Sequence, residues 1–197
     1  AAARSDLIIA VSQFTAGQVE QLLGVPRERI RVVPHGVLMP ASPPGVNARE
    51  KLVLHVGAIQ KRKNVARLVR AFEAMPPGWR LALAGSFGFG AAECLQAIES
   101  SPRRDSIDVL GYVDADTLAR LYSRAAILAY PSCAEGFGIP LLEAMAWGVP
   151  VVTSTGTALS EVAGEAALAV DPGDTQALSA ALVRLAEDTN LRSTLAA

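Results

Sequence analysis

Short apolar runs alternate with amphipathic stretches along most of the chain. From Lys51 onward the apolar runs predict six strands, over residues 51–57, 79–85, 106–111, 126–131, 149–154 and 166–172. Each run is continuous in its hydrophobicity, which is typical of parallel strands that are covered on both faces. The amphipathic stretches predict helices over residues 64–75, 115–125, 140–147 and 175–197. This order predicts an α/β fold with a doubly wound, Rossmann-like parallel sheet.

Polar residues that suit the first position of a helix precede several of these helices. Asn64 stands before apolar residues at 65, 68, 69 and 72, and we expect it to act as an N-cap. Asp114, with Asp116 as the alternative, suits the start of the helix over 115–125. Ser12 or Thr15 suits the start of an earlier helix.

Residues 1–40 have a different organisation. They predict a strand, a helix and a second strand, followed by a linker rich in proline and glycine. One such unit is too small to bury a core of its own. We therefore expect residues 1–40 to be a remnant of a preceding domain with its linker, and residues 41–197 to form the Rossmann-like domain.

Composition and charge exclude several classes of protein. Hydrophobic residues make up 51% of the 197 residues, which allows a substantial core, and the formal net charge of -1 argues against a nucleic-acid-binding protein. The residues that favour zinc, Cys94, Cys133, His35 and His55, are not spaced as metal ligands. No apolar run approaches the roughly 20 residues of a membrane helix, and no signal peptide is recognisable, so we expect a cytoplasmic protein.

The segment PSCAEGFGIPLLEAMAWGVPVVTS, residues 131–154, places two carboxylates in an apolar, glycine-rich run. Pro140 suits the first position of a helix, and Gly148 suits its end. The backbone N–H groups of Phe137, Gly138 and Ile139 then lie at the helix start, where they can bind an anion.

The two carboxylates of this segment are Glu135, just before the anion site, and Glu143, inside the helix. Apolar residues surround Glu143 in sequence, so we expect a buried acid that needs hydrogen-bond donors. Two sugar hydroxyls would serve, because an ionised carboxylate can accept from both. An internal ion pair with arginine or lysine is the alternative, and the sequence leaves both open.

The segment EGFGIPLLEAMAWGVPVVTS resembles the signature of retaining nucleotide-sugar glycosyltransferases of the GT-B fold, the glycosyl transferases group 1 family. The family includes bacterial mannosyl- and glucosyltransferases and, more distantly, sucrose and glycogen synthases. The segments ARSDLIIAVSQFT and IRVVPHGV resemble the end of the family's N-terminal domain and its linker, and VGAIQKRKN resembles the start of its C-terminal domain. The resemblance therefore extends over nearly all of the chain.

The resemblance implies a role for each matching residue. Glu143 would bind the ribose of the donor, and Glu135 would contact the transferred hexose. The backbone of residues 137–139 would hold the diphosphate, which Lys63 and Arg62 would also meet. A basic loop exposed to solvent is the alternative for KRKN. The resemblance makes Glu135, Lys63 and Arg62 the predicted catalytic residues.

The same resemblance assigns further donor-binding residues at the ends of the first three strands of this domain. Gly57, Gly85 and Ser86 would line the cleft, and Tyr112 and Val113 would frame the base, largely through backbone groups. Ordinary turns between strand and helix are the alternative for these positions.

The chain departs from the family pattern at three points. Ala58 stands where many members have arginine, and His35 stands where asparagine is frequent. The N-terminal domain that carries the acceptor site is absent from these 197 residues. We therefore expect the chain to be the donor-binding, C-terminal half of a GT-B enzyme and to be inactive in transfer by itself.

The resemblance implies a hexosyltransferase that uses a nucleotide-diphosphate sugar as donor and needs neither a cofactor nor a metal. The residues RKN of the basic loop favour GDP-mannose weakly over a UDP-hexose as the expected donor. The acceptor would be a sugar or a lipid-linked sugar. A peripheral contact with the inner face of the membrane would belong to the absent N-terminal domain.

Rival functions fit the motifs less well. A dinucleotide-dependent dehydrogenase needs G-x-G-x-x-G, which the segment GSFGFG does not match, and a nucleotide triphosphatase needs a phosphate loop that the sequence lacks. A non-catalytic nucleotide-sugar-binding module would be expected to have lost the basic loop or one glutamate, and neither is lost. A sugar-nucleotide epimerase on the same fold is disfavoured by the spacing of the two glutamates.

Overall fold

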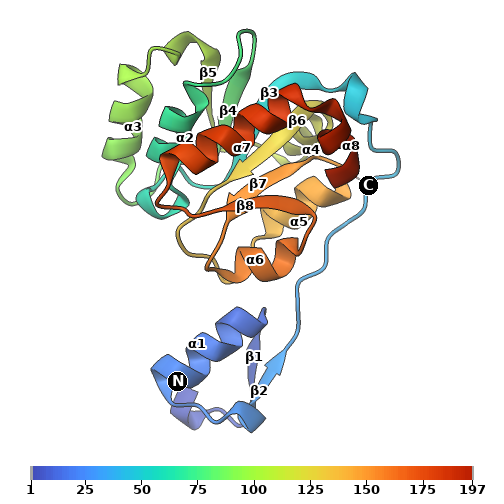
Figure 1. The fold of residues 1–197 in the computed structure, drawn as a ribbon. Helices are drawn as coiled ribbons and strands as arrows, with labels where there is room; N and C mark the ends of the chain where they lie inside the picture. Colours follow the sequence, from blue (N-terminus) through green and yellow to red (C-terminus); the bar gives the residue numbers. More distant parts are fainter. Residues whose placement is uncertain (1, 197) are drawn as a thin grey trace.

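The computed structural model describes residues 2–196 and contains one large parallel sheet (Figure 1). Its strands are β3 (Glu50–Val56), β4 (Arg80–Ala84), β5 (Ile107–Gly111), β6 (Ala125–Tyr130), β7 (Val151–Ser154) and β8 (Ala167–Val170). Their order in the sheet is β5-β4-β3-β6-β7-β8, and every neighbouring pair is parallel. This arrangement confirms the predicted doubly wound α/β fold. The chain reverses its direction of winding between β3 and β6, where such sheets bind their ligands.

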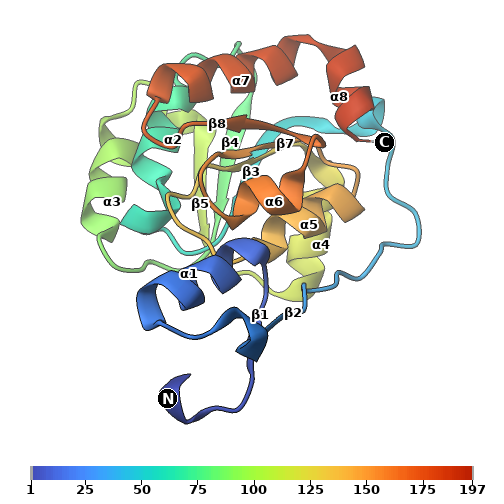
Figure 2. The same ribbon diagram turned by 60° about the horizontal axis from the view of Figure 1, so that its bottom comes forward.

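Helices cover both faces of this sheet (Figures 1 and 2). One face carries α2 (Val65–Phe72), α3 (Ala91–Ser100), α7 (Thr175–Glu187) and α8 (Thr189–Leu195), and the other carries α4 (Ala115–Arg124), α5 (Ile139–Ala146) and α6 (Ala158–Ala163). The sequence pattern predicted neither α3 nor α6 explicitly. It also predicted one closing helix over residues 175–197. The chain instead forms two, because α7 ends at Glu187 and the side chain of Asp188 caps α8 by accepting from the backbone N–H of Leu191. Within residues 2–196, no helix is both long and apolar enough to cross a membrane.

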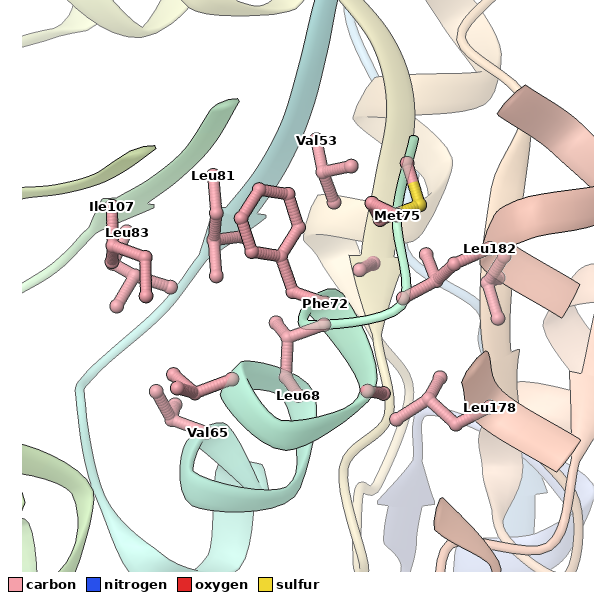
Figure 3. Close-up of a cluster of buried hydrophobic side chains, with 14 of the residues drawn as sticks. Val53, Val65, Leu68, Phe72, Met75, Leu81, Leu83, Ile107, Leu178 and Leu182 are labelled. Carbon is pink, nitrogen blue, oxygen red and sulfur yellow. The ribbon is translucent and has the colours of Figure 1, made fainter. Parts of the chain in front are cut away.

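Successive residues of a strand enter opposite cores. On β3, Leu52 and Leu54 pack with α4, α5 and α6, whereas Val53 packs with α2, α3 and α7. Figure 3 shows the second of these cores, in which Phe72 and Leu68 of α2 lie between the sheet and α7. Since both faces of the strand are buried, both alternating sets of side chains must be apolar. This is why the strands have continuous hydrophobic runs.

Two of the predicted helix caps form as expected. The side chain of Ser12 accepts a hydrogen bond from the backbone N–H of Thr15, at the start of α1 (Gln13–Leu23). The side chain of Asp114 accepts one from the backbone N–H of Thr117, at the start of α4. In both cases a short polar side chain satisfies an N–H group that the helix leaves free.

The predicted cap at Asn64 is wrong. Asn64 precedes α2 but lies in the left-handed region, with a φ of 61°, and its side chain caps no helical N–H group. Instead its amide donates to the carbonyl oxygens of Pro131 and Pro172, at 3.0 and 2.8 Å. The side chain therefore joins three loops at the carboxyl ends of β3, β6 and β8.

The N-terminal segment forms a separate small unit. It contains α1 and a two-stranded parallel sheet of β1 (Ile8–Ala10) and β2 (Ile30–Val32), and an extended connection leads from it to β3 (Figures 1 and 2). Ile9 and Leu22 are exposed, at 65% and 73% of their surface. The domain boundary near residue 40 stays a prediction.

Arg49 anchors the connection to the large domain. Its guanidinium donates to the carbonyl oxygens of Tyr122, in the last turn of α4, and of Ala125, just after it, at 2.9 and 3.0 Å, and to that of Trp147 at the end of α5. It also donates to the carbonyl oxygen of Pro44 in the connection, at 3.1 Å. These bonds fix the connection beside α4 and α5.

Candidate functional site

The loops that follow β3 and β6 meet at the point where the winding reverses. The backbone N–H of Cys133 donates to the carbonyl oxygen of Arg62 at 2.9 Å, and the guanidinium of Arg62 donates to the carbonyl oxygen of Ala134. These two contacts join segments about 70 residues apart in sequence. They bring together the three predicted catalytic residues Arg62, Lys63 and Glu135.

One carboxylate oxygen of Glu135 binds both cations. It lies 2.6 Å from Nζ of Lys63 and 2.9 Å from a guanidinium nitrogen of Arg62. Nζ of Lys63 also donates to the hydroxyl of Tyr130 and lies 4.6 Å from the centre of its ring. Lys63 is buried, whereas about half of the Arg62 side chain, 47%, is exposed. We name these four residues, Arg62, Lys63, Tyr130 and Glu135, the Glu135 cluster.

Burial and charge act in opposite directions within this cluster. Burial lowers the pKa of Lys63, and Glu135 partly offsets that shift. Burial raises the pKa of Glu135, but the hydrogen bond from Lys63 and the charges of Lys63 and Arg62 outweigh it, so the net shift is downward. Glu135 is therefore ionised at neutral pH and forms a true ion pair.

His55 lies behind the cluster and is completely buried in β3. Its Nδ1 is 3.0 Å from the carbonyl oxygen of Ala129, and its ring stacks on Tyr130 with centroids 6.0 Å apart. Burial lowers the pKa of His55 to about 4, so the imidazole is neutral at pH 7. No motif in the sequence predicts a role for either ring. Only the position of Tyr130, a polar aromatic residue at the end of an apolar strand, could have indicated a contact with the following loop.

Helix α5 begins beside the Glu135 cluster. Its first residue is Ile139, so Pro140 lies in the first turn, one position later than expected. Gly138 precedes it with a φ of 105°, and a side chain there would approach Leu159 to 2.4 Å. Phe137 is buried, and the ring of His35 contacts it edge-on at 5.0 Å. The predicted anion-binding residues thus lie where sequence analysis placed them, in a turn that requires glycine.

Glu143 has a different environment from the one predicted. It is only half-buried, and its Oε2 accepts a hydrogen bond from the hydroxyl of Tyr122 at 2.8 Å. The expectation of a fully buried acid is wrong, because α5 packs on the sheet and α6 with one side and borders a cavity with another. Within residues 2–196, Glu143 forms no ion pair with lysine or arginine, so the structure excludes that alternative there.

The cavity beside Glu143 has a volume of about 400 Å³. The connecting segment 36–40 forms one wall, and residues of α4 and α5, with Trp147, form the others: Ala115, Leu118, Ala119, Tyr122, Ile139 and Glu143. The walls are mainly apolar, with one carboxylate and one phenol among them. Tyr122 and the connecting segment were not predicted as parts of this site, since nothing in their local pattern points to Glu143.

Three glycine-rich turns meet at the carboxyl ends of β3, β4 and β5. The backbone N–H of Gly85 donates to the carbonyl oxygen of Gly111 at 2.7 Å, and a side chain on Gly85 would come within 2.0 Å of the carbonyl oxygen of Gly57. The carbonyl oxygen of Ser86 accepts from the backbone N–H of Ile59 at 2.9 Å. Gly57, Gly85 and Ser86 therefore lie together beside the basic loop.

Tyr112 and Val113 continue the chain from Gly111, the residue that bonds to Gly85. They follow β5, the edge strand, and Tyr112 is 83% exposed. Neither residue lines the cavity beside Glu143. Their contact with the base stays a prediction.

No group of three or more histidine, cysteine, aspartate or glutamate side chains in the described part of the chain could hold a metal ion. The absence of a metal requirement stays a prediction, because the reaction itself is what would test it. The cations that stand at the site are those of Lys63 and Arg62.

Comparison with known proteins matches both parts of the chain. Residues 50–188 match the family described as Glycosyl transferases group 1, and residues 1–38 match the one described as Glycosyltransferase Family 4. The O-antigen chain mannosyltransferase B of Escherichia coli is 36% identical over 201 residues, covering 94% of this chain and 53% of the relative. The O-antigen chain mannosyltransferase RfbU of Salmonella typhimurium is 29% identical, covering 89% of this chain and 49% of the relative.

Solved structures give the same result. Anabaena Alr3699/HepE, crystallised in complex with UDP and glucose, superimposes with a TM-score of 0.87 at 26% identity, over 98% of this chain and 56% of that chain. The sucrose-phosphate synthase of Thermosynechococcus elongatus superimposes with a TM-score of 0.85 at 28% identity, over 98% and 52%. This chain spans about half the length of the curated relatives it matches.

The family match covers the large sheet, both loops of the Glu135 cluster and helix α5 with Glu143. The structural matches extend it to the N-terminal unit and to the GT-B fold. The chain belongs to the glycosyl transferases group 1 family and has the fold of GT-B glycosyltransferases.

Proposed function

We propose that the chain binds the nucleotide-diphosphate sugar of a retaining hexosyl transfer. The observation that carries this proposal is the position of the Glu135 cluster, which lies at the reversal point of the sheet and directly before α5. The cations of Lys63 and Arg62 thus lie next to the start of α5, and this combination suits the binding of a diphosphate. Glu143, farther along the same helix, borders a cavity that suits a nucleoside.

The proposed mechanism is electrostatic. Negative charge develops on the diphosphate as the glycosidic bond breaks, and fixed cations and N–H groups stabilise it without a metal. Lys63 suits this role because Glu135 and Tyr130 hold its ammonium in place, and an ammonium has three hydrogens to donate. Glu135 would contact the hexose, and Glu143 would bind the ribose hydroxyls.

The relatives suggest the class of donor. Two of them are named as mannosyltransferases, and a structural neighbour binds UDP and glucose. We propose a GDP-mannose or UDP-hexose donor and a sugar or lipid-linked acceptor. Transfer would need the longer protein, because the acceptor must be held beside the donor for reaction.

Titration of the 197-residue chain with UDP, GDP and AMP, with and without a chelator, tests this proposal. We expect a nucleoside diphosphate to bind more tightly than AMP, and its affinity to survive the chelator. Arg62→Ala should weaken this binding more than Lys61→Ala, which removes an exposed charge from the same turn. Equal binding of AMP and both diphosphates, or loss of binding with the chelator, would contradict the proposal.

A further inference from the structure

Helix α1 of the N-terminal unit begins on a carboxylate of the large domain. Glu161, in α6, accepts hydrogen bonds from the backbone N–H of Gln13 at 2.8 Å and of Phe14 at 2.9 Å, one on each oxygen. Figures 1 and 2 show α1 beside α6. The first N–H groups of a helix have no partner inside it, and its N-terminus favours negative charge. Glu161 therefore binds the helix start from the other domain.

The same helix start contacts the loop of Glu135. The hydroxyls of Ser12 and Thr15 donate to the carbonyl oxygen of Gly136, at 2.7 and 2.9 Å. Ser12 is completely buried, and a side chain on Gly136 would approach the Thr15 hydroxyl to 3.3 Å. The contact is close and directional, and it reaches the backbone between the Glu135 cluster and α5.

The geometry of one peptide unit gives this contact a consequence for the donor site. The carbonyl of Gly136 and the N–H of Phe137 belong to the same planar peptide, and in a trans peptide they point in opposite directions. Hydroxyls that fix the carbonyl therefore fix the direction of the Phe137 N–H, away from α1. That N–H is one of the three backbone donors that we assign to the diphosphate.

We propose that Glu161, Ser12 and Thr15 form a positioning clasp, the α1 clasp, which orients the Phe137 amide. Glu161 holds the first turn of α1, and the two hydroxyls transmit its position to Gly136. None of the three residues lines the Glu143 cavity or belongs to the Glu135 cluster. The ligand of the oriented amide rests on the proposed function, whereas the orientation itself does not.

Amide resonances and nucleotide affinities of the 197-residue chain test the clasp. Glu161→Gln removes the charge but keeps the shape, and Glu165→Gln is the matched control, since Glu165 is an exposed glutamate just after α6. We expect Glu161→Gln to speed amide exchange at Gln13 and Phe14, to move the Phe137 resonance, and to weaken UDP and GDP binding about two- to tenfold. Glu165→Gln should change none of these.

A second pair of variants tests the hydroxyls. Thr15→Val should move the Phe137 resonance and weaken binding, whereas Thr15→Ser, which keeps the hydroxyl, should restore both. Thermal unfolding of each variant separates these effects from a loss of fold. The inference would be overturned if Glu161→Gln showed faster exchange at Gln13 and Phe14 but an unchanged Phe137 resonance and unchanged affinity. Glu161 would then hold α1 in place without orienting the Phe137 amide.

The Phe137 resonance tests the clasp even if the proposed function is wrong. A wild-type chain that binds neither UDP nor GDP would contradict the nucleotide-sugar donor. The Phe137 resonance in Glu161→Gln would then still decide the inference: a shift would support orientation by the clasp, and no shift would overturn it.

Discussion

Glu135 and Glu143 flank the same helix start but differ in what surrounds them. Glu135 is bound by Lys63 and Arg62 across the reversal point of the sheet. Glu143 is half-buried and bound by the hydroxyl of Tyr122 beside an apolar cavity. One carboxylate is thus neutralised within the protein, whereas the other keeps hydrogen-bonding capacity.

The difference teaches which property each glutamate should control. Breaking a buried ion pair leaves an uncompensated charge and destabilises the fold. Glu143 is half-buried, and in the described part of the chain its side chain is bound by a phenol and by no cation, so removing it leaves no such charge. Its loss should appear in ligand binding. We therefore expect variants of the Glu135 cluster to alter the free energy of unfolding, and variants beside Glu143 to alter affinity.

The largest effect is expected from Lys63→Ala. It leaves Glu135 with the half-exposed Arg62 as its remaining cation, so the charge is only partly compensated, and the free energy of unfolding should fall by about 3 kcal/mol, the lower end for a broken buried pair. Denaturant titration measures this change. Lys61→Ala, an exposed neighbour, should change the free energy of unfolding by less than about 0.5 kcal/mol. Equal midpoints for the two variants would show that the buried pair contributes nothing to stability.

His55, which stacks on Tyr130 of the Glu135 cluster, should make the stability of the fold sensitive to mild acid. Its pKa of about 4 in the folded chain lies below its ordinary value of 6.5, so the unfolded chain binds a proton first as the pH falls. Stability should therefore be complete above pH 6.5 and fall by about 3 kcal/mol between pH 6.5 and 4. Asparagine cannot titrate, so in His55→Asn the free energy of unfolding should change much less with pH across this range. A decline as steep as in wild type would assign the acid sensitivity to other groups.

Glu143→Ala should weaken nucleoside diphosphate binding by about 1.5–3 kcal/mol, because charge-assisted hydrogen bonds to the ribose are lost. Its unfolding should remain close to wild type. Tyr122→Phe keeps the carboxylate but removes its partner, and should weaken binding by about 1 kcal/mol. Calorimetric titration beside denaturant unfolding separates the two quantities. A large loss of stability with unchanged affinity would make Glu143 a structural residue and remove the contrast with Glu135.

The smallest effect on nucleotide affinity is expected from Glu135→Gln. This change frees Lys63 and Arg62 from a carboxylate, so UDP or GDP should bind at least as tightly as to wild type. Sugar transfer by the longer protein should nevertheless fall, because Glu135 is assigned to the hexose. Weaker binding of the free nucleotide than in Glu143→Ala would reverse the assignment of the two carboxylates.

Local patterns predicted most of the fold. Strands such as β3 and β6 were recognisable because a strand buried on both faces must be apolar throughout. Ser12 and Asp114 were recognisable as caps because their partners lie three residues away. Asn64 was not predictable in the same way, since its partners Pro131 and Pro172 are distant in sequence.

The residues of the candidate site also fall into those that a local motif predicts and those that it does not. The glutamates, the basic loop and the glycine turn before α5 stand in the sequence as motifs, because each depends on residue type at a fixed spacing. Tyr130, Tyr122 and His55 do not, because an aromatic residue in an apolar strand or on the apolar side of a helix is expected to be core. Their contacts exist only once β3 pairs with β6 and α4 packs beside α5.

The sequence by itself determined the α/β fold, the glycine turn at the start of α5, and the presence of two carboxylates around it. These features depend on hydrophobic period, glycine conformation and spacing along one segment. Only the tertiary structure decided that Glu135 is held by two cations, that Glu143 meets a tyrosine and a cavity, and that Glu161 binds helix α1. The physical reason is that a charge takes its partner from whatever the fold brings within about 4 Å, and that distance has no counterpart along the chain.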